Sequence, residues 1–242
     1  FFQGAYPEAL KLFEKVLEIR LKQNSDVDEK LAKVYDRLGE LYWRNGDYKR
    51  ALTLLFKSRD ILEQLYGKDS VKITNILNHI ARVYLIDSHV EEAKQILDRV
   101  IAIITREGNN DHIELAKAYD HYGWLYRSQS KLEEGIETLL KSVEIKKKYQ
   151  GPDKKGELGF TLNRLGRIYY DKTNAKKAEF YFKKVRKLYL EYYGPEHPIT
   201  ADLYCNLGDL KILQKEYKEA KKHYKKFFEI NHRVYGDLLN PN

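Results

Sequence analysis

The sequence is poor in the residues that build disulfide frameworks, metal sites and membrane spans. Its 242 residues include one cysteine, Cys205, and no methionine. A single thiol cannot form an internal disulfide, and no Cys/His spacing is typical of a zinc site. No run approaches the roughly 18 uncharged apolar residues that a membrane span needs, and no Asn-x-Ser/Thr glycosylation acceptor is present. These absences favour a reducing compartment, and we expect a cytoplasmic protein, in the producing cell or, for a delivered effector, in a host.

The first residues carry no visible targeting signal. Phe1-Phe2-Gln3-Gly4 has neither the basic region nor the long apolar run of a signal peptide. Because the chain does not begin with methionine, we interpret it as an excerpt of a longer protein.

Basic residues outnumber acidic ones. The formal net charge is +8, and 33% of the residues are charged. Much of the excess is lysine in the second half, at 146–148, 154–155, 183–184 and 221–222. Such a balance is compatible with binding to nucleic acid or anionic lipid. We interpret it instead as the solvated face of helices.

Small residues recur with one period along the whole chain. The first series is Gly39, Ala81, Gly123, Gly166 and Gly208, and the second is Ala9, Ala51, Ala93, Gly135, Ala178 and Ala220. A third series is Gly67, Gly108, Gly151, Gly194 and Gly236. Members of the first two series are 42 or 43 residues apart, which indicates a tandem repeat.

Each repeat has the periodicity of two helices separated by a short break. Apolar residues follow i, i+3, i+4 spacing on both sides of 45–47, from Leu38 to Tyr42 before it and from Ala51 to Ile61 after it. Because the break is short, the two helices must be antiparallel neighbours. The third glycine series predicts a left-handed residue near the end of each second helix.

The predicted fold class is therefore all-α, a single solenoid of antiparallel helix hairpins over 1–242. The expected units are a partial repeat (1–27), repeats at about 28–69, 70–111, 112–154 and 155–197, a final hairpin (198–236) and a tail (237–242). In the partial repeat the break falls at Gly4–Ala5, so that Phe1 and Phe2 align with the end of a first helix.

The small residues and a column of tyrosines have a packing explanation. Glycine inside a helix costs about 1 kcal/mol relative to alanine, so it needs a compensating close approach. We expect Gly39 to meet Ala51 where the two helices cross. Tyr42, Tyr84, Tyr126 and Tyr169 share one offset in the repeat. We expect this column to fill the space between hairpins and not to form a ligand cage.

These motifs resemble the tetratricopeptide repeat (TPR). The matching residues are Leu38-Gly39-x-x-Tyr42 with Gly46-x-Tyr48-x-x-Ala51, and Leu165-Gly166-x-x-Tyr169 with Ala178. Ordinary TPR units contain about 34 residues, whereas the longer period and the Gly-Pro-Glu-His-Pro link at 194–198 are similar to the kinesin light chain subclass. The resemblance implies a right-handed superhelical solenoid, whose first helices line a concave groove that binds peptide segments of other proteins.

Offsets from the Gly39 series identify the groove positions. Three residues earlier lie Asp36, Asn78, Asp120, Asn163 and Cys205; two earlier lie Arg37, His79, His121, Arg164 and Asn206; one later lie Glu40, Arg82, Trp124, Arg167 and Asp209. These columns are unusually polar for a helix face beside a core. All of them except Cys205 and Asp209, together with Arg127, are the predicted peptide-contacting residues.

The chemistry of these columns suits a linear segment. Asparagine can both donate to and accept from a peptide backbone. The resemblance implies that Asn78 and Asn163 match the motif asparagine that holds peptide backbone in the kinesin light chain subclass, with basic residues nearby holding acidic side chains. The sequence departs from that pattern by carrying Asp at two matching positions and Cys at a third.

We expect the bound segment to be acidic. Arginine can bind a carboxylate with two parallel hydrogen bonds, and the expected basic patches are Arg82 with Arg127 and Arg164 with Arg167. Trp124 would add a flat apolar contact, typical of an interface anchor.

An enzyme is not indicated by any motif. Gly151-x-x-x-x-Gly156 is followed by Glu157-Leu158 instead of the Lys-Ser/Thr of a phosphate loop. His79 and His121 hold equivalent positions in successive repeats, which is the arrangement that could suit a metal, and Cys205 is interpreted as a small apolar filler. We predict no catalytic residue, cofactor, metal or small-molecule substrate.

Two other functions stay open from the sequence. Helical repeats can bind RNA, but base-reading repeats place matched side chains for one base per unit, and Asp36, Glu40 and Asp120 would repel phosphate. We therefore do not expect nucleic acid. The groove could instead hold a segment of the same full-length protein, or the ends of the solenoid could stack into oligomers. The sequence does not identify the partner or the oligomeric state.

Overall fold

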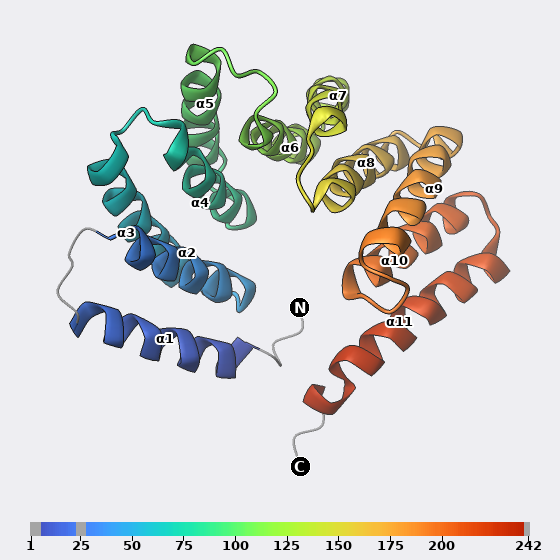
Figure 1. Cartoon of the computed structure of the whole chain (residues 1–242). Helices are drawn as coiled ribbons and strands as arrows, with labels where there is room; N and C mark the ends of the chain where they lie inside the picture. The colour runs from blue at the N-terminus through green and yellow to red at the C-terminus, as the bar shows by residue number, and fades with distance from the viewer. Residues whose placement is uncertain (1–5, 23–27, 240–242) are drawn as a thin grey trace. The chain divides into compact units, whose positions relative to one another are not determined.

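The structure is a computed structural model that describes residues 6–22 and 28–239. All regular structure in these ranges is helical, which confirms the all-α prediction. The helices, in chain order in Figure 1, are α1 (Tyr6–Lys22), α2 (Glu29–Arg44), α3 (Tyr48–Tyr66), the 3-10 turn η1 (Val71–Ile73), α4 (Thr74–Ile86), α5 (Val90–Arg106), α6 (Ile113–Ser128), α7 (Leu132–Lys148), α8 (Lys154–Asp171), α9 (Ala175–Tyr192), α10 (Pro198–Leu213) and α11 (Tyr217–Leu239).

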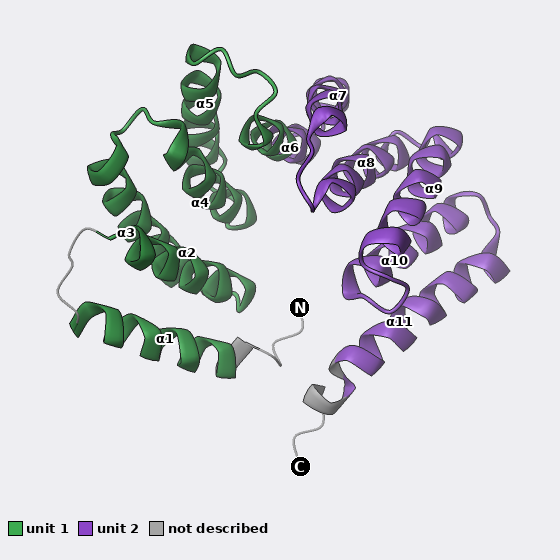
Figure 2. Cartoon of the chain, in the orientation of Figure 1, with its two compact units in different colours: residues 1–121 green, residues 122–242 purple. Residues whose placement is uncertain are grey.

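The chain divides into two compact units, residues 1–121 and 122–242, with the boundary inside α6 (Figure 2). In unit 1, α2 packs against α3 and α4 against α5, and α3 also packs against α4. In unit 2, α8 packs against α9 and α10 against α11, with α7 on α8 and α9 on α10. Each interval predicted as a repeat or final hairpin contains one helix pair, and only small end shifts occur, such as α8 beginning at Lys154. That one solenoid runs through both units stays a prediction.

The five hairpin turns among the described residues share one hydrogen-bond pattern. After α2, the Asp47 N–H donates to the Tyr42 carbonyl (2.9 Å) and the Gly46 N–H donates to the Trp43 carbonyl (3.1 Å). This is the Schellman arrangement, which places one residue after the helix in the left-handed region. The residues in that place are Gly46, Ser88, Ser130, Thr173 and Lys215, with φ between 54° and 86°. Four of the five turns therefore hold a side chain in a conformation that glycine adopts more easily.

Glycines also follow three of the second helices, as predicted. Gly67, Gly108 and Gly194 have φ of 88°, 69° and 83° and lie after α3, α5 and α9. The expectation is wrong at Gly151, which follows α7 but is not in the left-handed region. It is also wrong at Gly236, because α11 continues through that residue to Leu239.

The Gly39 series allows each first helix to approach its partner closely. A Cβ on Gly39 would lie 2.7 Å from Cγ and Cδ2 of Leu55 and 3.3 Å from the carbonyl oxygen of Ala51. The same overlap recurs between Gly123 and Leu139, Gly166 and Phe182, and Gly208 and Tyr224. The predicted close approach is confirmed, although the first neighbour is the large residue one turn beyond Ala51.

The tyrosine column packs both between and within hairpins. The Tyr84 ring lies 6.3 Å from the ring of Phe56, across the α3–α4 contact. Tyr169 is buried and stacks on Tyr181 of its own hairpin, with centroids 5.4 Å apart. The column therefore belongs to the packing of the repeats.

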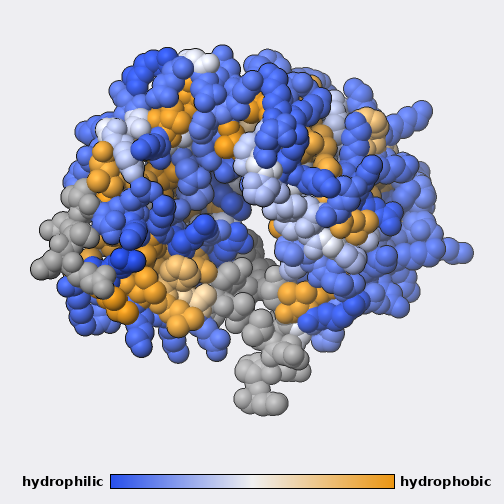
Figure 3. Space-filling view, viewed as in Figure 1, coloured by the Kyte–Doolittle hydropathy of each residue, from blue (hydrophilic) through white to orange (hydrophobic). Residues whose placement is uncertain are grey.

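No helix in the described part of the chain is long and apolar enough to cross a membrane. The face shown in Figure 3 is mainly hydrophilic, with separate apolar patches. Phe1, Phe2 and the break expected at Gly4–Ala5 lie outside the described residues.

Candidate functional site

The predicted groove columns lie on the first helices of the hairpins. In unit 1 they lie on α2, α4 and the first part of α6, and in unit 2 on the rest of α6, α8 and α10. We call these two sets the unit 1 face and the unit 2 face. Arg82 and Arg127, which the sequence analysis joined in one basic patch, belong to different units, and their pairing stays a prediction.

A hydrogen bond joins α2 to α4 on the unit 1 face. Nδ1 of His79 lies 2.6 Å from Oδ1 of Asp36, and both side chains are partly exposed. The two residues sit at neighbouring column positions of successive repeats. An ionised carboxylate can only accept a hydrogen bond, so Nδ1 must carry the proton in this contact. The Asp36 carboxylate therefore selects the form of the ring that is protonated at Nδ1.

Asn78 is buried and joins α4 to α6. It is 1% exposed, and its Nδ2 donates to Oε2 of Glu114 (2.8 Å) and to the Glu114 carbonyl (3.0 Å). Asn75 and Lys117 also donate to the same carboxylate, at 3.2 Å and 2.9 Å. Burial alone would raise the pKa of Glu114, but the Lys117 charge and these hydrogen bonds hold that pKa below its ordinary value. The motif asparagine of this repeat therefore braces two first helices.

Arg82 stacks on a tryptophan that the sequence columns did not include. Its guanidinium carbon lies 4.3 Å from the centroid of the Trp43 ring. The two side chains, with Glu40, Leu55 and His79, line a shallow cleft between α2 and α4. Attraction between the guanidinium charge and the face of the ring restricts the motion of the Arg82 side chain, which lowers the cost of ordering it beside a carboxylate. Trp43 lies four residues after Gly39, outside the three columns of the sequence analysis. The chain has few tryptophans, and this scarcity was the signal that could have identified Trp43 as a candidate residue.

The remaining predicted residues of unit 1 are paired locally or buried. Arg37 is exposed and bonds Glu40 at 2.9 Å, and Arg44 bonds the other oxygen of Glu40 at 2.8 Å. Asp120 and His121 are buried, at 6% and 9% exposure. The accessible part of the unit 1 face is therefore formed by α2 and α4.

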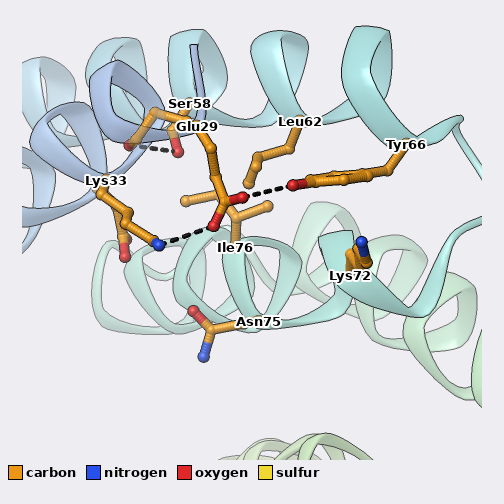
Figure 4. Close-up of a pocket in the computed structure, with 10 residues that line it drawn as sticks. Glu29, Lys33, Ser58, Leu62, Tyr66, Lys72, Asn75 and Ile76 are labelled. Atoms are coloured by element: carbon orange, nitrogen blue, oxygen red, sulfur yellow. Dashed lines mark hydrogen bonds and ion pairs between the residues drawn. The ribbon is translucent and has the colours of Figure 1, made fainter.

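A pocket of about 370 Å³ extends the unit 1 face beyond Asp36. Figure 4 shows its lining, which comes from α2, α3, the η1 turn and α4. Glu29 accepts a hydrogen bond from the Tyr66 hydroxyl and pairs with Lys33 at 2.7 Å. The bonds from Lys33 and Tyr66 lower the pKa of Glu29. With apolar Ile76 on one wall, the pocket offers donors, acceptors and an apolar contact to a side chain of a bound segment.

On the unit 2 face, a chain of polar side chains joins α8 to α10. The Asn206 Nδ2 donates to Oδ1 of Asn163 at 2.9 Å, and Arg167 donates to Oδ1 of Asn206. Arg167 also lies 4.0 Å from Asp209. Three of the predicted residues are thus brought together, in a network that fixes the neighbouring helices.

Two more predicted residues pair with partners of unit 2. The guanidinium carbon of Arg164 lies 5.5 Å from the Trp124 ring centroid. Arg127 bonds both carboxylate oxygens of Asp171, at 2.5 Å and 3.2 Å. Arg164 and Arg167 share α8 but contact different groups. An arginine from a neighbouring first helix therefore lies over a tryptophan on each face, from different column positions.

No cluster of three or more His, Cys, Asp or Glu side chains that could hold a metal ion occurs among the described residues. Burial, followed by the charge of Asp209, raises the pKa of the Cys205 thiol above its ordinary value. A thiol in that environment is a poor nucleophile.

Comparisons with known proteins agree on the fold. The tetratricopeptide repeat family matches residues 1–64, 30–89, 72–148 and 157–231. No protein of curated function matches the sequence. The crystal structure of BtubC (BKLC) from P. vanneervenii is similar with a TM-score of 0.71 and 16% identity, over 98% of this chain and 94% of that one.

Two further solved structures share the architecture. A Rap protein complexed with competence and sporulation factor aligns with a TM-score of 0.79 and 13% identity, over 98% of this chain and 63% of its own length. Nearly identical TPR-like repeats of a putative kinesin light chain from Podosopora anserina align with a TM-score of 0.61 and 19% identity, over 85% of this chain and 96% of that one. The predicted solenoid fold class is confirmed, and the chain belongs to the tetratricopeptide repeat family.

Proposed function

We propose that the chain binds an extended, acidic segment of a partner protein along the first-helix faces, as a non-catalytic scaffold or adaptor. Proteins built from tetratricopeptide repeats are generally scaffolds for protein interactions. The structurally similar Rap protein is described in complex with a sporulation factor. Placement in a cytoplasm stays a prediction.

The observation that carries the proposal is the contact of Arg82 with Trp43, on the same face as the pocket of about 370 Å³ that begins at Asp36. The guanidinium gives a flat, oriented group for a carboxylate, and the tryptophan gives apolar area of the kind that dominates interfaces. The pocket begins at Asp36 on α2 and is lined by α2 and α4 together with α3 and η1. An acidic residue at Arg82 and a second side chain in the pocket would together fix the register of a bound segment.

Several column residues support the face instead of contacting a ligand in this proposal. Asn78 is buried against Glu114, and Asn206 connects Asn163 to Arg167. Their cross-helix bonds hold adjacent first helices at a fixed spacing. Preorganisation of this kind lowers the cost of ordering an interface on binding.

The test is a titration of peptides against charge-reversed variants. Fluorescent peptides of matched length, one rich in Asp and Glu and one with these residues changed to Lys, are titrated against the parent protein by anisotropy. The variants are Arg82→Glu on the unit 1 face and Arg164→Glu on the unit 2 face. The matched controls are Lys49→Glu on α3 and Arg186→Glu on α9, which make the same charge change on exposed positions of second helices.

We expect the acidic peptide to bind more tightly than the basic one, and each face variant to weaken it at least about tenfold, or 1.4 kcal/mol. Control variants should change the affinity less than about twofold. Equal affinity for both peptides would end the charge preference. An equal loss in face and control variants would show general attraction by net charge.

The RNA alternative is separated in the same assay. A labelled single-stranded RNA that binds more tightly than the acidic peptide, with an affinity that falls steeply as salt rises, would favour nucleic-acid binding. An affinity of that kind would contradict the proposal.

A further inference from the structure

An apolar groove lies on the second-helix side of unit 2. It has a volume of about 470 Å³ and lies between α7 and α9, with α8 as its floor. We call it the α7–α9 groove. Its floor and walls are mostly aliphatic and aromatic, with Val143, Leu162 and Leu188 among them. Two large side chains at the groove, Leu140 and Phe180, are 41% and 53% exposed. It shares no residue with the first-helix faces.

The repeat itself provides a comparison, because unit 1 contains the equivalent helices α3 and α5. There, Arg99 on α5 bonds Glu63 on α3 at 2.7 Å and also donates to the carbonyl of Lys68. This ion pair spans the two second helices. The position equivalent to Phe180, two residues after the repeating small residue of the second helix (Ala178 in α9, Ala93 in α5), is Gln95 in unit 1.

The same ion pair cannot form in unit 2. Counted from Ala51 and Gly135, Glu63 corresponds to Lys147; counted from Ala93 and Ala178, Arg99 corresponds to Lys184. Both residues line the α7–α9 groove. Two ammonium groups repel each other, so no bridge joins α7 to α9 at this level. The groove is left open where unit 1 is bridged.

The charged residues around the groove favour a partner with acidic side chains. Of the two acidic residues on its rim, Glu144 pairs with Lys147 at 2.8 Å and Glu191 pairs with Lys155 at 2.8 Å. Lys184 lies over the exposed Phe180 ring, 4.1 Å from its centroid. Unit 2 as a whole has 25 lysines and arginines against 16 acidic residues, whereas unit 1 has 19 against 20. The groove is thus an apolar slot in the strongly basic half of the chain.

We propose that the α7–α9 groove is a second docking site, which binds an amphipathic helix of a partner protein whose apolar stripe is flanked by Asp and Glu. Helices of this kind bind in apolar grooves through anchors at i, i+3 or i+4, and i+7. The groove volume lies in the range of specific ligand sites, about 300–1,000 Å³. Acidic residues beside the stripe would face Lys147, Lys184 and Lys187 and would exclude basic helices. With the first-helix faces, the chain would then connect two partners.

The probe is a fluorescein-labelled helical peptide with leucines at i, i+3, i+4 and i+7 and glutamates on both sides. Two matched peptides replace either the glutamates with lysines or the leucines with serines. The decisive variant is Lys147→Glu with Lys184→Arg, which installs in unit 2 the residues that bridge α3 and α5 in unit 1. Because the same pair already folds in this chain, the variant should keep its helical content. The control, Lys176→Glu with Lys183→Arg, makes the same charge change on α9 outside the groove.

We expect the glutamate peptide to bind the parent and the control variant equally, and the bridged variant at least about tenfold more weakly. Phe180→Gln should weaken binding in the same direction without unfolding the protein. The lysine and serine peptides should bind at least about tenfold more weakly than the glutamate peptide.

Other results would overturn the proposal. Unchanged affinity in the bridged variant would remove the groove as the site, and equal binding of the lysine peptide would remove the charge selection. Light scattering is run in parallel on the parent and the bridged variant. A concentration-dependent dimer that only the parent forms would assign the groove to a second copy of the chain. Displacement of the peptide by micromolar oleate, with no dimer, would assign it to an anionic lipid.

Discussion

Replacing Asn78 with alanine removes the amide that joins α4 to α6. The amide donates one hydrogen bond to a carboxylate and one to a carbonyl of Glu114. A bond to a charged group contributes about 1.5–3 kcal/mol and a neutral one about 0.5–1.5 kcal/mol. Against this, Oδ1 of Asn78 is buried with no hydrogen-bond donor among the described residues, so its removal relieves about 1–3 kcal/mol. The small cavity left behind adds about 1 kcal/mol.

The net expectation is a loss of about 2 kcal/mol in the free energy of unfolding. Urea unfolding followed by helical circular dichroism measures it, and with a slope of about 2 kcal/mol per molar urea the midpoint falls by about 1 M. Asn163→Ala is the matched control. Asn163 is only half-buried and accepts a single bond from Asn206, so we expect a loss of about 1 kcal/mol or less.

The charge of Glu114 provides an independent check. The pKa of this carboxyl is lowered in the folded protein, so its contribution to stability is present above the ordinary value near 4.5 and is lost as pH falls through the folded value. Neutralising it with Glu114→Gln should therefore shrink the effect of Asn78→Ala. A double-mutant cycle at pH 7 should give a coupling of about 1–2 kcal/mol. If Asn78→Ala costs less than about 0.5 kcal/mol, or if the two changes are additive, the bracing role is wrong.

Three further predictions concern the scaffold. Gly166→Ala should destabilise the protein by about 1–3 kcal/mol in urea unfolding, because the new Cβ overlaps the Phe182 ring, and a neutral result would refute the close approach. Thr173→Gly should raise the free energy of unfolding by about 0.5–1 kcal/mol. The left-handed conformation of Thr173 costs about 1–2 kcal/mol, and removing this cost outweighs the conformational entropy that glycine loses on folding. A lower melting temperature would contradict this. Nδ1 of His197 accepts from the N–H of Ile199 at the start of α10, and burial lowers its pKa, so stability should fall as pH drops below about 6.5. His197→Asn keeps a cap that does not titrate, and an unchanged pH slope between 7 and 5 would contradict the assignment.

The places where the two helices of a hairpin cross could be predicted because they depend on steric contacts that only small residues allow. Gly39 and Gly166 fix where helices cross, and the turn pattern around Gly46 fixes where they end. The prediction of left-handed glycines failed at Gly151 and at Gly236, because a glycine at this spacing can also adopt an ordinary φ in the linker or lie inside a longer helix. No sequence spacing distinguishes those cases.

The burial of the side chains in the three columns could not be predicted from the sequence. The offset from Gly39 gives the side of a helix on which a residue lies, but two residues at one offset can have different surroundings. Asn78 is enclosed because Glu114 lies against it, whereas Asn163 faces the smaller network with Asn206 and stays half-buried. Glu114 itself lies six residues before Asp120, the first column position of α6, where the sequence shows only an acidic residue in a first helical turn.

The α7–α9 groove shows a similar limit. The sequence analysis interpreted the lysine clusters as solvated faces. Lys147 and Lys184 occupy the positions of a bridging ion pair on two neighbouring second helices. The sequence alone does not show this, because the ion pair between Glu63 and Arg99 is what identifies the positions of neighbouring repeats that meet. Two residues that meet between repeats lie at different distances from the small residue of their own helix. The repeat period alone predicts neither of these distances.

The central claim, that a partner segment lies on the first-helix faces, is tested most directly by intrinsic fluorescence. The chain has two tryptophans, Trp43 and Trp124, and each stacks with an arginine of a proposed face. Acrylamide quenching is measured with and without a saturating acidic peptide, in the parent and in Trp43→Phe and Trp124→Phe, so that each face is observed separately. We predict that the bound peptide reduces the quenching of at least one tryptophan. Saturation confirmed by anisotropy, with the quenching of both tryptophans unchanged, would place the peptide elsewhere and contradict the account.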